Sequence, residues 1–349
     1  AYGADVASYF FVIAALLYWK RPAKAKTELN EHFFGAFRAG LRYVKASREL
    51  HRVLFRAAMY FAFASAIWAL LPLVARTMLH GTAGFYGLLL GAVGGGAIAG
   101  ALLLPRLRSK LSNDGLMLLS AVLSALVMLA LAMSPPQWLA LLLMLVLGVG
   151  WIIALTTLNG VAQAVLPDWV RGRGLAVYLM VFNGTLAGGS LAWGLIAQQL
   201  GLATTLMIAG AGLVITGVLL KRLALPAGEA DLQPAEHWAM PVVHDDVDVR
   251  HGPVLIQIRY RVPQEDRAAF KKAIHKLAQS RRRDGAYSWG LMEQTDDPTA
   301  LLEWFMVESW QEHMRQHQRV SHADAELQQA VLQYHQGEEA PQVSHHIAI

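Results

Sequence analysis

Polar side chains recur within one of the most apolar stretches of the chain. Thr156, Asn159 and Gln163 stand in the segment ALTTLNGVAQAVL, which continues directly from LALLLMLVLGVGWII. At 100° per residue the three side chains fall within about 60° of one another on a helix, on a stripe shared with Ile152. An amide that faces lipid is costly, so this stripe is expected to face protein or water. We interpret it as the wall of a solute path, the alternative being hydrogen bonds to a neighbouring helix.

Two further apolar segments repeat this arrangement. Residues 54–79 place Phe61, Ser65, Trp68, Pro72 and Arg76 on one helical face, and residues 175–198 cluster Asn183, Ser190 and Trp193. The candidate substrate-path residues are therefore Ser65, Trp68, Arg76, Thr156, Asn159, Gln163, Asn183 and Ser190.

Proton coupling usually needs a carboxylate inside a membrane span. Among the expected spans, the interior holds one acid, Asp5, near the outer end of the first. Asp5 is the coupling candidate; capping the helix or bonding a neighbour is the alternative. We predict no catalytic residue, no cofactor and no metal.

The composition is that of a membrane protein. Of 349 residues, 55% are hydrophobic and only 16% are charged, and the apolar runs all lie before Lys221. The last hundred residues have the balance of a water-soluble domain. The absence of cysteine excludes disulfides and thiolate metal sites.

Seven apolar segments are long enough to cross the hydrocarbon core of a membrane, for which a helix needs about 20 apolar residues. The joints between them alternate between basic and nearly neutral, and the positive-inside rule places the basic joints in the cytoplasm. The cations therefore indicate contact with anionic lipid and not with nucleic acid. The chain is expected to begin outside the cell, to end in a cytoplasmic domain, and to be a fragment preceded by further spans. The expected spans are 4–19, 54–79, 86–104, 116–133, 138–163, 175–198 and 203–220.

A basic amphipathic segment separates the first two spans. Phe33, Phe37, Leu41 and Val44 recur at helical spacing, with arginines and lysines on the other faces. This pattern predicts a helix lying in the inner membrane interface. Glycines at four-residue spacing in 86–104 and 175–198 predict close helix packing.

Four sequence stretches resemble the C-terminal half of a major facilitator superfamily transporter: GLRYVKASRELHRVL, LLPLVARTML, YGLLLGAVGGGAIAGALLLPRLRSK and PDWVRGRGLAVYLMVFNGTLAGGSLAWG. Within this superfamily the similarity is to the enterobactin-exporter-like branch, or transmembrane secretion effectors. The resemblance implies an α-helical polytopic bundle, with the seven spans as helices six to twelve of twelve, around a cavity that opens alternately to either side. It also implies gating by cytoplasmic-loop cations, here Arg106, Arg108, Arg171 and Arg173. PRLRSKLSNDG lacks the family's acid before those cations.

Residues 223–251 are rich in proline and acid and are expected to form a linker, followed by a domain at 252–349. Its predicted βαββααβ order, with Gly285 ending the first helix, resembles the small ferredoxin-like dimeric α+β barrel of antibiotic-biosynthesis-monooxygenase-like (ABM-like) proteins. The resemblance implies a homodimer formed through this domain. His313 and His317 share a helical face near His322; a ligand pocket and simple solvated or interface positions are both favoured over a metal.

The sequence therefore predicts a secondary active transporter of an inner (plasma) membrane. It would export small apolar or siderophore-like molecules, with a proton as the candidate coupling ion, and would not be an enzyme. The alternative is a membrane-anchored oxygenase or ligand-binding protein that acts through the C-terminal domain.

Overall fold

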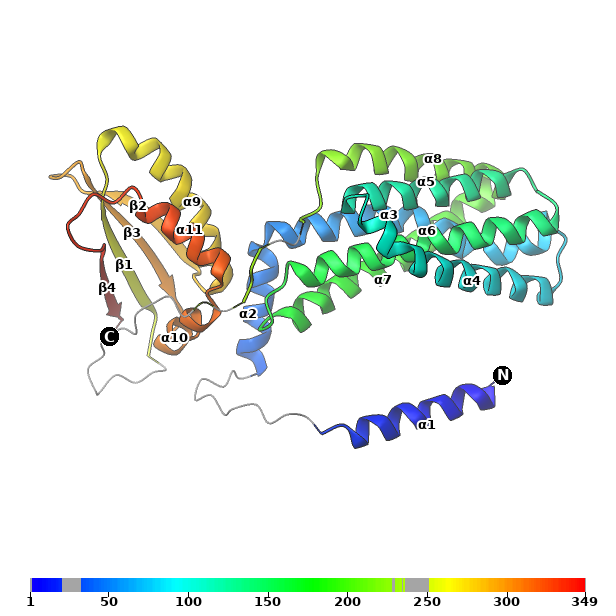
Figure 1. The fold of residues 1–349 in the computed structure, drawn as a ribbon, viewed down its shortest axis with the longest axis horizontal. Coiled ribbons are helices and arrows are strands. Elements are labelled where there is room, and N and C mark those ends of the chain that lie inside the picture. The colour runs from blue at the N-terminus through cyan, green and yellow to red at the C-terminus, as the bar shows by residue number, and fades with distance from the viewer. Residues whose placement is uncertain (1, 21–32, 228–229, 234, 236–250, 349) are drawn as a thin grey trace. The chain divides into compact units, whose positions relative to one another are not determined.

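The computed structural model describes residues 2–20, 33–227, 230–233, 235 and 251–348 (Figure 1). It divides into two compact units, residues 1–36 and residues 37–349. The first unit contains α1 (Tyr2–Tyr18), an apolar helix of 17 residues where the span 4–19 is expected. Asp5 lies in α1, but its side chain is outside the described part of the chain. Its role in coupling stays a prediction.

Six helices within the described residues are long and apolar enough to cross a membrane. The expected number is seven; α1 is shorter than these six, so its assignment as a span stays a prediction. Each of the six begins and ends within a few residues of an expected span. They are α3 (Arg48–Leu73), extended by the π-helical turn η1 (Val74–Met78), α4 (Ala83–Arg108), α5 (Asn113–Ala132), α6 (Gln137–Ala164), α7 (Arg171–Leu200) and α8 (Leu202–Leu219), extended by η2 (Leu220–Arg222).

The helices pack in a defined order. α3 packs against α7 and α8, α4 against α6, and α5 against α6 and α8. A Cβ added to Gly96 or Gly148 would lie 1.9 Å or 2.1 Å from a backbone oxygen of the facing helix, so α4 and α6 touch along their backbones. In α7 the four-residue spacing consists of Gly184 and Gly188, which face open space, and the close helix contact is instead at Gly189.

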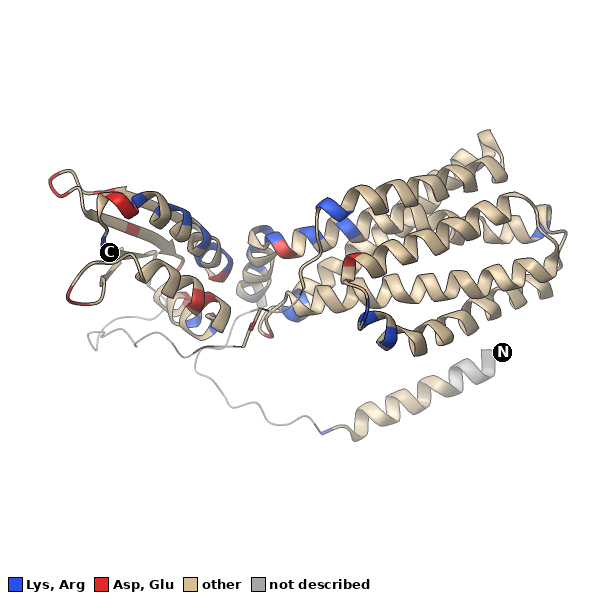
Figure 2. Cartoon of the chain, turned by 45° about the horizontal axis from the view of Figure 1, so that its top comes forward, with Lys and Arg blue, Asp and Glu red and all other residues tan. Residues whose placement is uncertain are grey.

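The cationic joints converge at one end of the bundle. Arg56 at the start of α3 pairs with Asp114 at the start of α5, and Arg108 at the end of α4 reaches Thr156 O near the end of α6. Figure 2 shows that the middles of these helices are almost free of charge. This convergence agrees with the charge alternation predicted from the sequence.

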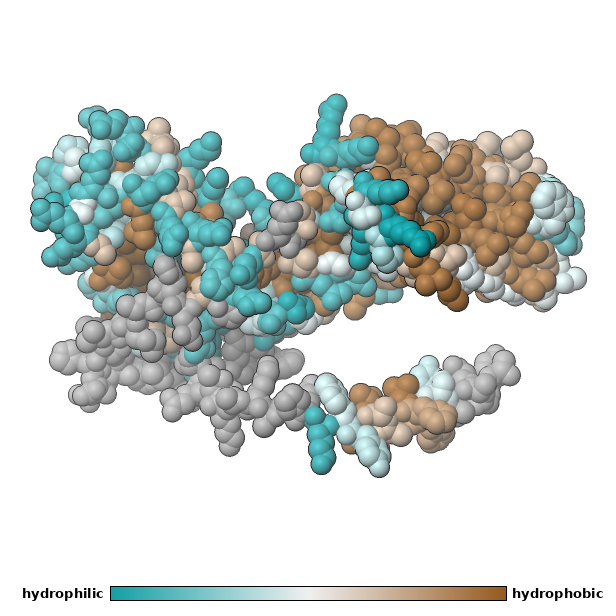
Figure 3. Space-filling model, viewed as in Figure 1, coloured by the Kyte–Doolittle hydropathy of each residue, from teal (hydrophilic) through white to brown (hydrophobic). Residues whose placement is uncertain are grey.

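The described C-terminal residues form an antiparallel four-stranded sheet in the order β2-β3-β1-β4. Figure 3 shows its mainly hydrophilic surface and the hydrophobic surface of the helices. The sheet has its own core, in which alternate β1 side chains such as Ile256 and Tyr260 pack against Phe270 and Ile274 of α9. The elements follow the predicted order: β1 (Val254–Arg261), η3 (Gln264–Asp266), α9 (Arg267–Asp284), β2 (Ser288–Glu293), β3 (Ala300–Val307), α10 (Trp310–Arg319), α11 (His322–Leu332) and β4 (Gln342–Ile347).

Two local signals define the helix ends of this domain. Gly285 has a φ of 150° and directly follows α9, as the sequence predicts for a glycine stop. Ser321 and Asp324 form a capping box at the start of α11. The ferredoxin-like assignment and the homodimer stay predictions.

The first part of the expected linker contacts the bundle through Leu225 and the C-terminal domain through Ala235. Leu225 packs in the helical core and its N–H donates to Asp114. Ala235 N–H donates to Val320 O, beside the start of α11. The remainder of the expected linker, residues 236–250, lies outside the described residues.

Candidate functional site

The α6 stripe contains two amides without a hydrogen-bond partner in the described part of the chain. Asn159 is half-buried and Gln163 is exposed. The hydroxyl of Thr156, by contrast, donates to Ile152 O at 2.6 Å within its own helix. A membrane helix that leaves amides unbonded must offer them to water, solute or another protein segment.

Ser65 and Trp193 lie where α3 meets α7. The Ser65 hydroxyl is fully buried and donates to Ala62 O at 2.8 Å. The Trp193 indole N–H donates to the same oxygen at 2.6 Å. The backbone of Gly189 approaches Ser65 closely, since an added Cβ would lie 2.2 Å from its Oγ. Ser65 therefore serves helix packing, and lining of a path by Ser65 stays a prediction.

An aromatic cluster joins α3, α6 and α7. The Phe61 ring lies 5.5 Å from Trp151 and 4.5 Å from Phe182, and Trp68 lies 4.9 Å from Trp151, all edge to face. Trp68 Nε1 is buried and finds no acceptor in the described residues. Trp151 and Phe182 were not predicted from the sequence. The sequence feature that could have identified them is that each is an aromatic residue directly before a residue of the polar stripe in its span, Ile152 and Asn183 respectively.

The other predicted path residues are spread along the bundle. Asn183 is exposed on α7 and its amide donates to Leu179 O at 2.8 Å within the helix; Ser190 is half-buried two turns further on. Arg76 is exposed in the π-helical turn η1 and lines a cavity of about 410 Å³ with Thr82 and Tyr86. The structure therefore joins Trp68 to the aromatic cluster and leaves the other predicted path residues apart from it, with Arg76 at the opposite end of the bundle from the cationic joints.

The four predicted gating cations lie at helix ends, two at the end of α4 and two at the start of α7. Arg106 and Arg108 occupy the last turn of α4, where cations favour the helix dipole. Arg171 pairs with Asp168 at 2.5 Å and donates to Leu166 O at 3.3 Å. The side chain of Arg173 packs over Gly40 of α2 (Phe33–Ala46). No acid of the described chain pairs with Arg108. Gating by all four cations stays a prediction.

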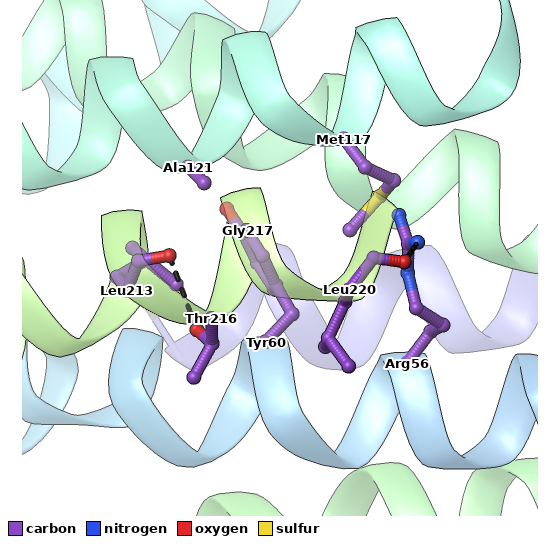
Figure 4. A pocket seen from close by; sticks show the side chains of 8 residues that line it. All are labelled: Arg56, Tyr60, Met117, Ala121, Leu213, Thr216, Gly217 and Leu220. Atoms are coloured by element: carbon purple, nitrogen blue, oxygen red, sulfur yellow. Dashed lines mark hydrogen bonds between the residues drawn. The ribbon is translucent and has the colours of Figure 1, made fainter. Parts of the chain in front are cut away.

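A smaller hollow lies between α3, α5 and α8. Figure 4 shows the side chains of Arg56 and Tyr60 directed towards it, with Leu220 beside Arg56. Its volume of about 10 Å³ has room for about one water molecule, so it is too small to pass a solute. We therefore assign this hollow to the packing of the bundle.

The C-terminal domain holds three histidines near one another. His313 Nε2 and His317 Nε2 on α10 are 3.2 Å apart, and the His345 ring on β4 lies 4.9 Å from that of His313. Burial, with the positive charge that His317 and His345 would carry, lowers the pKa of His313 to about 3; burial lowers that of His317 to about 4. The imidazoles are therefore neutral at pH 7. The described residues contain no group of three or more His, Asp or Glu arranged to hold a metal ion.

Six apolar helices with unbonded amides and cationic ends define a multi-pass membrane protein. The whole chain, residues 1–349, matches the model of the transmembrane secretion effector family. The chain belongs to this family of major facilitator superfamily membrane transporters, which implies a small-molecule substrate. Neither the curated proteins nor the solved structures contain a match to it.

Proposed function

We propose that the chain is a secondary active exporter of small, largely apolar or siderophore-like molecules that works by alternating access. The observation that carries this proposal is the pair of α6 amides, Asn159 and Gln163, that have no hydrogen-bond partner in the described helices. A span that only anchors a domain gains nothing from such amides. The aromatic cluster around Trp151 offers an apolar surface on the same helix, two turns before Asn159.

The convergence of cationic joints supports an orientation in an inner (plasma) membrane, with the C-terminal domain in the cytoplasm. Alternating access would then connect that side to the Arg76 cavity at the opposite end of the bundle. Asp5 stays the proposed proton-coupling residue.

Transport in vesicles tests the proposal. Export of a catecholate siderophore and of an apolar fluorescent dye is compared between wild type, Asn159→Leu and a deletion of residues 226–349. Gln199→Leu is the matched control, since it removes an exposed amide at the outer end of α7. Loss of export in Asn159→Leu, with export retained in the control and the deletion, supports the proposal. Full export by Asn159→Leu contradicts it.

The imidazole cluster favours a second candidate, a membrane-anchored oxygenase or ligand-binding activity in the C-terminal domain. His313 is buried and close to two further neutral imidazoles, which suits the hydrogen-bonding wall of a ligand site. The test is oxygen uptake by the full chain with an added catechol. Uptake that His313→Gln abolishes supports the second candidate, and no uptake by the wild type counts against the oxygenase.

A further inference from the structure

The C-terminal domain contacts the amphipathic helix α2 through a forked ion pair. Arg42 Nη1 lies 3.2 Å from Glu308 Oε1, and Arg42 Nη2 lies 2.8 Å from Glu312 Oε1. The Arg42 side chain is only 17% exposed and that of Glu312 only 8%. The Arg42–Glu312 arm of this fork is largely removed from water and is a specific contact, whereas the Glu308 side chain is 43% exposed and its pair is partly solvated.

A second contact joins the same domain to the joint between α6 and α7. The Arg319 guanidinium lies over the Trp169 ring at 4.3 Å and also pairs with Glu312 at 2.8 Å. Trp169 packs edge to face on Tyr43 of α2 at 5.6 Å, and the Tyr43 hydroxyl donates to Val165 O at 3.1 Å. We call the whole set the clasp: Arg42, Tyr43, Trp169, Glu308, Glu312 and Arg319.

The clasp surrounds the joint that carries two of the predicted gating cations. Arg171 follows Trp169 by two residues, and Arg173 packs against Gly40 of α2, where an added Cβ would lie 2.7 Å from its Cδ. This joint connects α6 to α7, the two helices that carry Asn159 and Asn183. A movement of the inner end of α7 away from α2 would therefore break contacts of the clasp.

We propose that the C-terminal domain regulates the transport path by docking on α2 and on the α6–α7 joint through the clasp. This inference rests on the proposed function. Docking requires α2 and the joint to be adjacent, so it stabilises the conformation in which they touch. By thermodynamic reciprocity, release of the domain shifts the bundle away from that conformation and changes the surroundings of the inner end of α6.

Docking itself is tested by distance measurements on the full chain in detergent or nanodiscs. The chain has no cysteine, so Leu111→Cys on the bundle and Tyr287→Cys on the domain, both exposed, accept a single pair of spin labels. Arg42→Gln removes the Arg42 ion pairs between α2 and the C-terminal domain, and it should leave the fold of the bundle and of the domain intact. Trp169→Leu provides a second variant, and Arg52→Gln is the control, because it removes an exposed cation one helix turn from the bundle's inner end.

The expected result is one dominant distance in wild type and in Arg52→Gln, and a broad distribution in Arg42→Gln and Trp169→Leu. Coupling is then measured at Gln163→Cys with a membrane-impermeant thiol reagent. Its labelling rate should change at least about fivefold when Arg42 is replaced, and should not change in the Arg52→Gln background.

An unchanged distance distribution in both clasp variants overturns the proposal. So does a released domain with an unchanged labelling rate, because docking would then be uncoupled from the path. A Gln163→Cys that never reacts, in any background, counts against the proposed path itself, whereas the distance measurement still reports on docking.

Discussion

Arg56 on α3 and Asp114 on α5 form an ion pair of 2.9 Å at the cationic end of the bundle. The same arginine donates to the carbonyls of Leu220 and Leu223 at the end of α8, and Asp114 accepts from Leu225 N–H. The Arg56 side chain is only 3% exposed. One pair therefore holds together three helices and the first residues of the linker.

We expect Asp114→Asn to destabilise the bundle by about 3 kcal/mol, because it leaves a buried guanidinium without its counter-charge. Thermal unfolding in detergent measures the loss. The double variant Arg56→Met/Asp114→Leu should recover much of it, since no charge is then left unpaired. Asp168→Asn breaks an exposed pair and should cost no more than about 0.5 kcal/mol. Equal losses in Asp114→Asn and Asp168→Asn would show that the buried pair is not structural.

Gly148→Ala should destabilise the contact between α4 and α6 by about 1–3 kcal/mol, because the added methyl group meets Val93 O of α4. The matched control is Gly94→Ala, where no atom lies within 4 Å of an added Cβ. Alanine also has the better helix propensity, so the control should be neutral or slightly stabilising. Thermal unfolding of both variants checks this, and a stable Gly148→Ala would disprove the close approach.

The domain should lose stability as the pH falls from about 6.5 towards 4. Burial lowers the pKa of His317 to about 4, and an unfolded histidine has a pKa near 6.5. Between these values the unfolded chain binds a proton that the folded domain does not, so stability is present above pH 6.5 and declines below it. The buried Asp284, whose pKa is raised to about 6, acts in the opposite direction.

The two effects separate in a comparison of wild type with His317→Gln, because Asp284 is common to both. Hydrogen exchange of the β1 amides in the full chain should show a pH slope that is smaller in the variant by up to about 1.4 kcal/mol per pH unit. Identical slopes would mean that His317 is protonated as readily in the folded domain as in the unfolded chain.

Much of the fold follows from short-range sequence patterns. Long apolar runs identified the six spans, Gly285 identified the end of α9, and alternation identified β1. The apolar pattern also predicted α1 as a helix, but a helix of 17 residues is short for a membrane span, so hydropathy alone does not assign it to the membrane.

The candidate site was less predictable because its contacts join residues far apart in the sequence. Periodicity placed Ser65 and Trp68 on one face of α3, yet Ser65 packs on Gly189 whereas Trp68 meets Trp151. The amphipathic pattern identified α2, but Arg42 finds its acid 270 residues away, at Glu312. No local pattern contains that partner.

The most direct test of the central claim is thiol labelling along α6 in the otherwise cysteine-free chain. We predict that Asn159→Cys in membrane vesicles reacts with a water-soluble, membrane-impermeant reagent and that a transported solute protects it. Leu142→Cys, on an exposed apolar position of the same helix, should not react. An unreactive Asn159→Cys, or equal labelling at both positions, would contradict a watery path along the amide stripe.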